Sequence, residues 1–312
     1  MSRRPDRRTD QNYYRISITK NMSASDQHKI HLGISTCPND TFAFYGLIND
    51  QVDLRGLTFD VELMDVQQLN DRLLAGEFDV AKASFHAALL VADETVVLPS
   101  GSALGFGNGP LLLSRHPDRT PADFVDSSRP PIVLCPGETT TATLLYRLFY
   151  EQPCDLRQVV FSEIMPALKN GTADFGVCIH EGRFTWQQSG LFKVADLGQT
   201  WLDDSSQPLP LGGILARTRL GTDLLGKVQQ VIQDSIRYGL ANREATLPFM
   251  RQHADEFDDQ VLMAHVDLYV NENTIELSSA GVQALDCLSR KATQLKQVPG
   301  QVGYKALRVL NS

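Results

Sequence analysis

A short unit occurs twice in this chain, and the repeat limits the possible folds more than any other feature. Residues 73–86 (LLAGEFDVAKASFH) align without gaps on residues 168–181 (LKNGTADFGVCIHE). The alignment pairs three positions of one copy with three of the other: Gly76 with Gly171, Asp79 with Asp174, and Phe85 with His180. Each copy reads as a helix, a glycine stop, an aspartate and a short buried strand. Two such copies favour two similar lobes that face each other.

Apolar strands alternate with helices in both halves of the chain, and the part after residue 221 reads as helices alone. This order is typical of parallel βαβ units, so the sequence predicts an open α/β sheet. A chain of 312 residues also exceeds the usual size of one compact core. Two α/β lobes are therefore expected on independent grounds.

Two segments rich in glycine and proline predict where the chain crosses between the lobes. The glycines of SGSALGFGNGP precede a strand instead of opening a helix, which argues for a hinge and against a dinucleotide-binding fingerprint. The segment PLPLGG at 208–213 is the natural return crossing. We expect a first lobe of residues 30–108 and 214–312, which includes the C-terminal helices, and a second lobe of residues 109–213.

Residues 1–29 differ in character from the rest of the chain. They hold seven Lys or Arg and three Asp, without apolar periodicity. The sequence predicts a disordered basic tail here, or an upstream extension with Met22 as an alternative start. An export signal would need an apolar stretch after the arginines, and none follows.

Composition excludes several classes of function. The net charge of −8 argues against a nucleic-acid partner, whose binding needs clustered cations. No run of about 18 apolar residues predicts a membrane span. The five cysteines are an odd number without CxxC spacing, so neither a metal centre nor a disulfide framework is expected, and a cytoplasmic location fits best.

The end of the second repeat carries the best candidate for chemistry. Ligands of open α/β sheets bind outside the carboxyl ends of the strands, so Ser84 and His180 should line one cleft from opposite sides. An imidazole there suits general-base work near neutral pH, although a core histidine bonded to backbone is the competing interpretation. Arg183 can hold a substrate carboxylate in a fork of hydrogen bonds, or form a surface salt bridge.

The segment PGETTTA joins a strand end to a helix start, where backbone N–H groups attract anions. We expect one or two threonines, Thr140 and Thr141, to face the cleft. The segment lacks the lysine of a Walker loop, so a nucleoside triphosphate is not expected.

Further candidates come from the other half of the chain. Lys82 and Ser84 end the first repeat's strand and can contact an anion, or be a solvated lysine and a helix cap. Asn39 lies at another strand-to-helix junction, where helix capping accounts for Asp40. His86, His253 and His265 are interpreted as core, surface or packing residues, and no His/Glu pair has metal spacing.

Six motifs together resemble the 1,4-dihydroxy-6-naphthoate synthases of the futalosine route to menaquinone. They occur in order between residues 30 and 287: SxCPNDTF, KASFHA, SGSALGFGNGP, PGETTTA, IHEGRFT and PLPLGG. The resemblance implies a two-lobed periplasmic-binding-protein-like (type II) fold with mixed, mainly parallel sheets and a hinge of two crossover strands. It also implies a carbon–carbon lyase that converts cyclic dehypoxanthine futalosine to 1,4-dihydroxy-6-naphthoate without a cofactor.

The resemblance also assigns roles to residues. It implies that His180 accepts a proton and that Lys82, Ala83, Ser84, Thr141 and Ala142 contact a small carboxylate substrate. The chain has Glu138 and Thr139 where the family can show His or Arg, so these two side chains carry no expectation. Two rival functions remain: a non-catalytic solute-binding protein for an organic anion, and the sister chorismate dehydratase. A ligand-responsive regulatory domain is a third, without an accompanying DNA-binding element.

Overall fold

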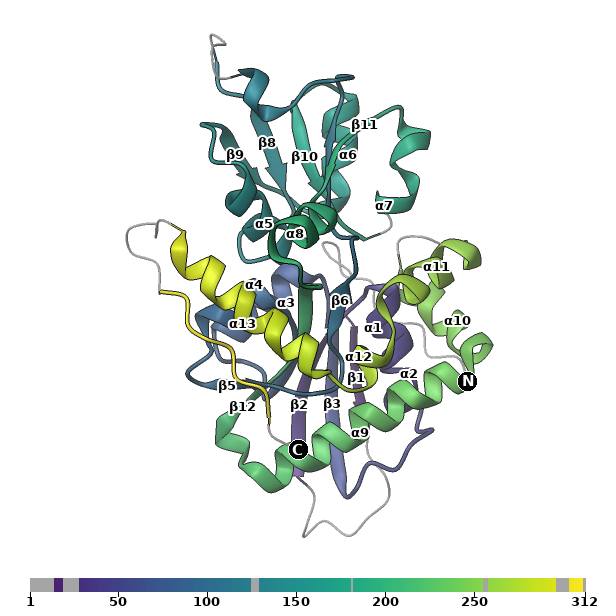
Figure 1. Cartoon of the computed structure of the whole chain (residues 1–312). Coiled ribbons are helices and arrows are strands. Elements are labelled where there is room, and N and C mark those ends of the chain that lie inside the picture. The colour runs from purple at the N-terminus through teal and green to yellow at the C-terminus, as the bar shows by residue number, and fades with distance from the viewer. Residues whose placement is uncertain are drawn as a thin grey trace.

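The computed structural model describes residues 14–18, 28–124, 129–180, 182–254, 258–295 and 303–310, which form two lobes, each built around one sheet (Figure 1). The strand order of the first sheet is β1-β3-β2-β4-β12-β5, and β6 pairs with β12. Its strands are β1 (Tyr14–Ile18), β2 (His28–Ser35), β3 (Leu57–Met64), β4 (Val80–Ser84), β5 (Thr95–Val97), β6 (Ala103–Gly105) and β12 (Leu209–Arg217). Its helices are α1 (Pro38–Ala43), α2 (Tyr45–Ile48), α3 (Val66–Leu74), α4 (Phe85–Leu90), α9 (Thr222–Ala241), α10 (Arg243–His253), α11 (Asp259–Tyr269), α12 (Glu272–Ile275) and α13 (Ser279–Gln294).

The second sheet has the strand order β11-β7-β10-β8-β9. Its strands are β7 (Leu111–Ser114), β8 (Ile132–Cys135), β9 (Asp155–Gln158), β10 (Phe175–Cys178) and β11 (Phe192–Asp196). Its helices are α5 (Thr141–Phe149), α6 (Phe161–Lys169), α7 (Gly182–Thr185) and α8 (Leu197–Ser205). Short 3-10 turns occupy Pro121–Phe124, Trp186–Ser189 and Thr218–Leu220.

Both sheets contain parallel and antiparallel pairs of strands. The parallel pairs are β2 with β3 and β4 in the first sheet, and β8 with β9 and β10 in the second. Strands that join from the flanks, such as β12 and β7, pair antiparallel with their neighbours. The predicted two-lobed α/β fold with mixed sheets is confirmed, and so are the helices after residue 221.

The internal repeat has a structural basis in its two aspartates. Asp79 and His31 bond in both directions: the Asp79 N–H donates to the His31 carbonyl at 3.1 Å, and its carboxylate accepts from the His31 N–H at 3.1 Å. Asp174 makes the same two bonds with Ile132, at 3.0 and 2.9 Å. Each aspartate therefore aligns the start of one parallel strand with the neighbouring strand.

Glycines end the helix of each repeat for a backbone reason. Gly76 and Gly171 have φ of 81° and 74°, in the left-handed region that side chains disfavour. The two copies are thus equivalent in space as well as in sequence.

The hinge lies close to the two predicted segments. The chain leaves the first sheet after β6 and enters the second at β7. It returns at β12, which pairs antiparallel with β6 through Leu209 and Gly105. The predicted return segment at 208–213 therefore overlaps the first part of β12.

The two lobes share one continuous hydrophobic core. Leu89 of α4, Leu145 of α5, Trp201 of α8 and Leu288 of α13 are all fully buried members of the same cluster. Helix α5 of the second lobe packs on α4, α13 and β12 of the first. Because an apolar contact of this kind opposes motion of one lobe relative to the other, the two lobes are held together where α5 packs on the first lobe.

The prediction of a disordered tail over residues 1–29 is wrong for Tyr14–Ile18, which forms β1 at the edge of the first sheet beside β3. Arg15 lies opposite Glu62 in the register of β1 and β3, and its side chain reaches the Asp60 carboxylate, with 3.0 Å between Nε and Oδ1. The hydrogen bond from Arg15 holds the pKa of Asp60 well below its ordinary value, against the effect of burial. The ion pair with β3 helps to hold this strand at the sheet edge. The rest of the tail, apart from the start of β2, lies outside the described residues.

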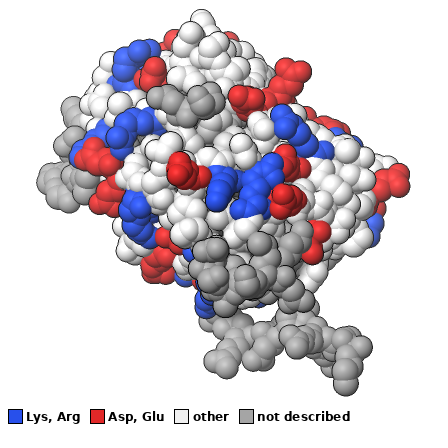
Figure 2. All heavy atoms as spheres, turned by 90° about the horizontal axis from the view of Figure 1, so that it is seen from below, with Lys and Arg blue, Asp and Glu red and all other residues white. Residues whose placement is uncertain are grey.

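The end of the first lobe carries mixed charge. Figure 2 shows Lys and Arg side chains interspersed with Asp and Glu over the described part of this face. Ion pairs such as Arg55 with Asp234, at 2.6 Å, are typical of it. Among the described residues, no helix is both long and apolar enough to cross a lipid bilayer.

We expect Asp174→Asn to lower the free energy of unfolding by about 1–3 kcal/mol at pH 7, because a buried strand amide loses its charged acceptor. Burial raises the pKa of Asp174, but hydrogen bonds from Arg129 and the Ile132 amide outweigh it, and the net shift is downward. A lowered carboxyl pKa stabilises the fold above the ordinary pKa, and this contribution is lost as pH falls through the native value.

Urea unfolding at pH 7 and in acid measures this effect. The difference between wild type and Asp174→Asn should shrink in acid. The matched control is Asp155→Asn on the neighbouring strand, whose exposed pair with Arg157 should leave the urea midpoint close to wild type. Equal destabilisation by both variants would contradict the role of the repeat.

Candidate active site

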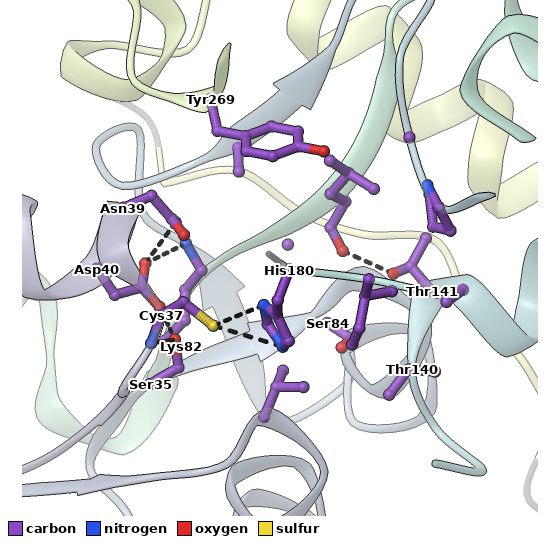
Figure 3. Close-up of a pocket in the computed structure, with 18 of the residues that line it drawn as sticks. Ser35, Cys37, Asn39, Asp40, Lys82, Ser84, Thr140, Thr141, His180 and Tyr269 are labelled. Atoms are coloured by element: carbon purple, nitrogen blue, oxygen red, sulfur yellow. Dashed lines mark hydrogen bonds and ion pairs between the residues drawn. The ribbon is translucent and has the colours of Figure 1, made fainter. Parts of the chain in front are cut away.

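A pocket lies where the carboxyl ends of the strands of the two lobes meet. Its cavity volume is about 120 Å³. The first lobe contributes the end of β4, the start of α1 and part of α11, and the second contributes the end of β10 and the start of α5. Figure 3 shows side chains from both lobes pointing into this space.

All nine residues predicted for the site line this pocket. They are Asn39, Lys82, Ala83, Ser84, Thr140, Thr141, Ala142, His180 and Arg183. The prediction that both repeat strands end at one cleft is therefore confirmed. Glu181, a candidate to orient the imidazole, lies outside the described residues.

His180 is presented by a strained backbone. It follows the end of β10 with a φ of 55°, in the left-handed region where histidine is tolerated better than bulky or β-branched residues. Its ring packs edge-on against Phe161, with centroids 4.6 Å apart. Strain of this kind is often stored at functional sites, because the surrounding packing forces the side chain toward its target.

The His180 ring meets the opposite lobe through Cys37. The Cys37 Sγ atom lies 3.0 Å from Nδ1 and 3.6 Å from Nε2 of the imidazole. In the view of Figure 3, the ring is drawn between Cys37 and the side chains of Ser84 and Thr141. A thiol is a weak hydrogen-bond donor, so a ligand with stronger donors or acceptors can displace it from the ring.

Lys82 is not the unpaired cation that the sequence suggested. Its Nζ atom lies 2.8 Å from Oδ1 of Asp40 and donates to the Gly101 carbonyl at 3.2 Å. Asp40 also accepts from Ser35 at 2.5 Å and from the Asn39 amide at 3.0 Å. The floor of the pocket therefore holds a buried, internally neutralised ion pair.

The interpretation of Asp40 as a helix cap is wrong. Helix α1 begins at Pro38 with Cys37 at the N-cap, and no side chain caps it. Proline favours the first helical position because its φ is fixed and it has no N–H to satisfy. Asp40 thus falls inside the first turn, where it is free of the capping role and pairs with Lys82.

Arg183 is also paired within the protein. Its guanidinium lies 2.6 Å from Oδ2 of Asp196 and donates to the Gly109 carbonyl at 2.5 Å. The salt-bridge interpretation therefore describes Arg183 better than the binding of a substrate carboxylate. The salt bridge lies at the pocket wall, and the bond to Gly109 links α7 to the predicted hinge segment.

Neutral donors remain for an anion. The Thr140 hydroxyl donates to the Gly137 carbonyl at 2.9 Å, and the Thr141 hydroxyl donates to the Leu211 carbonyl at 2.6 Å. Both hydroxyls are thus used in holding the start of α5, whose first amides belong to Thr141 and Ala142. Ser84 accepts from the Asn70 amide at 3.1 Å, which leaves its own O–H as a donor.

Several lining residues were not predicted as site residues from the sequence, among them Cys37, His265 and Tyr269. His265 of α11 is buried, bonds Asn39 Oδ1 through Nε2 at 3.1 Å, and packs on Tyr269 with ring centroids 5.0 Å apart. Burial and the nearby charges of His180 and Lys82 lower the pKa of His265 to about 3. Burial raises the pKa of Tyr269 to about 12. No sequence signal distinguished these residues, because the packing of α11 on α1 is a long-range contact.

The site combines the His180 imidazole with neutral hydrogen-bond donors in a largely apolar cavity. No group of three or more His, Cys, Asp or Glu residues with metal-binding geometry occurs in the described part of the chain. The arrangement is suited to moving a proton on a bound organic anion.

The fold is similar to that of several solved structures. A protein from Archaeoglobus fulgidus superposes with a TM-score of 0.79 at 26% identity, over 86% of this chain and 98% of that one. The alkanesulfonate-binding protein SsuA from Xanthomonas axonopodis pv. citri superposes with a TM-score of 0.60 at 13% identity, over 88% of this chain and 96% of that one. The second likeness supports the periplasmic-binding-protein-like fold alone.

Two curated relatives are much closer in sequence. A 1,4-dihydroxy-6-naphthoate synthase from Streptomyces coelicolor is 39% identical over 275 residues, covering 86% of this chain and 95% of the relative. A protein of the same name from Thermus thermophilus is 39% identical over 263 residues, covering 84% and 93%. A family model described as menaquinone biosynthesis matches residues 30–294. The chain therefore belongs to the menaquinone biosynthesis family.

Proposed function

We propose that this protein is a carbon–carbon lyase that converts cyclic dehypoxanthine futalosine to 1,4-dihydroxy-6-naphthoate. The observation that carries the proposal is the position of His180 at the end of β10, inside a pocket lined by every predicted substrate-contacting residue. The curated relatives carry the name of this activity and align over most of their length. Neither the solute-binding protein nor the chorismate dehydratase has a comparable observation in its favour.

His180 is proposed as the general base. A cyclised, sugar-bearing substrate must lose a proton before its C–C and C–O bonds break and the ring becomes aromatic. Aromatisation drives the reaction, so the protein needs mainly a base, an anchor for the substrate and exclusion of water. The apolar contact with Phe161 and the weak contact with Cys37 support an imidazole that stays available for proton transfer.

The substrate carboxylate is proposed to bind neutral donors. Lys82 and Arg183 are each paired with a carboxylate, whereas Thr141 and Ala142 at the start of α5, and Ser84 of the other lobe, line the pocket and offer neutral donors. Helix N-termini stabilise anions through their amides and dipole. This mode of binding holds a carboxylate without leaving a buried, unpaired cation when the pocket is empty.

The division into lobes and the location in the cell complete the proposal. The two lobes are proposed to form the two walls of the cleft, one from residues 30–108 with 214–312 and the other from residues 109–213. The buried thiols of Cys135, Cys178 and Cys287 are free, which supports a reducing, cytoplasmic setting.

The direct test is incubation of the protein with cyclic dehypoxanthine futalosine, followed by mass spectrometry of the products. We expect formation of 1,4-dihydroxy-6-naphthoate and release of a small sugar fragment. Tight binding of the substrate without product would favour the solute-binding alternative.

We expect His180→Ala to lower kcat by about 10²–10⁴-fold, because general-base catalysis contributes rate factors of this size. Binding of the product, measured by calorimetry, should be retained. His116→Ala, which removes a histidine outside the pocket lining, is the matched control and should keep wild-type turnover. Near-normal turnover by His180→Ala would refute the assignment of the base.

We expect Ser84→Ala to raise KM about two- to tenfold with little change in kcat, because it removes one neutral hydrogen bond to the carboxylate. Ser102→Ala, at a buried serine outside the pocket lining, should leave both constants unchanged. A fall in kcat at unchanged KM in Ser84→Ala would mean that this hydroxyl acts on the reacting atoms instead.

A further inference from the structure

The described C-terminal segment, residues 303–310, is bound along the first lobe. The Lys305 N–H donates to the Leu89 carbonyl at 3.0 Å, and Val97 bonds both Arg308 and Leu310 at 2.8 and 2.9 Å. Leu307 is buried in the core that the two lobes share. In Figure 1 this yellow segment descends beside α13 and α4 toward β5.

Tyr304 of this segment contacts a buried histidine, His86. Its hydroxyl lies 2.8 Å from Nε2 of His86, and the two ring centroids are 5.4 Å apart. Burial raises the pKa of the Tyr304 hydroxyl, so the oxygen keeps its proton. Burial also lowers the pKa of His86, to about 4, so the imidazole is neutral near pH 7.

The bonds of His86 fix which nitrogen carries its proton. Nδ1 lies 3.0 Å from the Thr140 carbonyl. A carbonyl oxygen only accepts, so Nδ1 is the donor and Nε2 is the bare acceptor for the Tyr304 O–H. The bonds therefore run in one direction, from Tyr304 to His86 to Thr140.

We call this chain of hydrogen bonds the relay. It ends at Thr140, on the turn that leads into the proposed anion-binding amides of α5. Thr140 is the N-cap of α5, and its carbonyl is the group that His86 holds. The His86 backbone N–H also donates to the Thr141 hydroxyl at 3.3 Å. His86 belongs to the first lobe and α5 to the second. These hydrogen bonds therefore hold the start of α5 across the boundary between the lobes.

We propose that Tyr304, acting through His86, is a positioning residue that fixes the start of α5 for binding of the substrate carboxylate. The inference rests on the proposed function and extends it to the C-terminal segment. A shift of an anchor by a fraction of an ångström weakens binding, because amide donors are directional. Neither side chain lines the pocket, so neither is a catalytic residue.

Tyr304→Phe removes only the hydroxyl and keeps the ring. We expect KM for cyclic dehypoxanthine futalosine to rise about two- to tenfold with kcat near wild type, because the anchor is weakened and the base is untouched. Hydrogen exchange of the amides at the start of α5 should also be faster in this variant. Tyr150→Phe, at the opposite end of α5, is the matched control and should change neither readout.

A double-mutant cycle with His86→Phe tests the relay itself. Adding Tyr304→Phe to His86→Phe should raise KM no further, because the same relay is already broken. Independent, multiplying effects would overturn the proposal, and so would wild-type KM and exchange in Tyr304→Phe. If wild type itself gives no product, the proposed function fails, while the exchange comparison still decides whether Tyr304 fixes α5.

Discussion

The buried ion pair between Lys82 and Asp40 determines what the pocket can hold. With 2.8 Å between the charged atoms, the two charges cancel, and Ser35 and Asn39 complete the hydrogen bonds of the carboxylate. A buried pair tolerates loss of either partner poorly, so the floor of the site is fixed. In the proposed mechanism, neutral donors bind the anion and the His180 imidazole transfers the proton.

This division of labour depends on how the lobes are joined. One core runs through both lobes, and the hydrogen bonds of His86 cross the same boundary. The pocket lies between the lobes, where Cys37 of one lobe touches His180 of the other. A cleft built this way is well suited to holding a base and an anchor at a set separation, which is what a reaction driven by aromatisation requires of the protein.

Local sequence signals predicted the two lobes and the crossing segments, because strand ends, glycine stops and helix starts are encoded within a few residues. Together with the family resemblance, they also predicted nine of the residues that line the pocket. Partners at long range were not predictable. Asp40 was interpreted as a helix cap, but the helix begins at Pro38, so Asp40 lies in its first turn. Strand β1 is held by the contact between Arg15 and Asp60 of β3, which are far apart in the sequence. His265 and Tyr304 reach the site or its support from helices and a segment more than 200 residues beyond their partners, Asn39 and His86.

The crystal structure of the protein with 1,4-dihydroxy-6-naphthoate bound tests the central claim most directly. The account predicts the carboxylate on the amides of Thr141 and Ala142 and on the Ser84 hydroxyl, with the ring beside His180. The Lys82–Asp40 and Arg183–Asp196 pairs should remain intact. A carboxylate bound to a released Lys82 or Arg183, or a ring distant from His180, would contradict it.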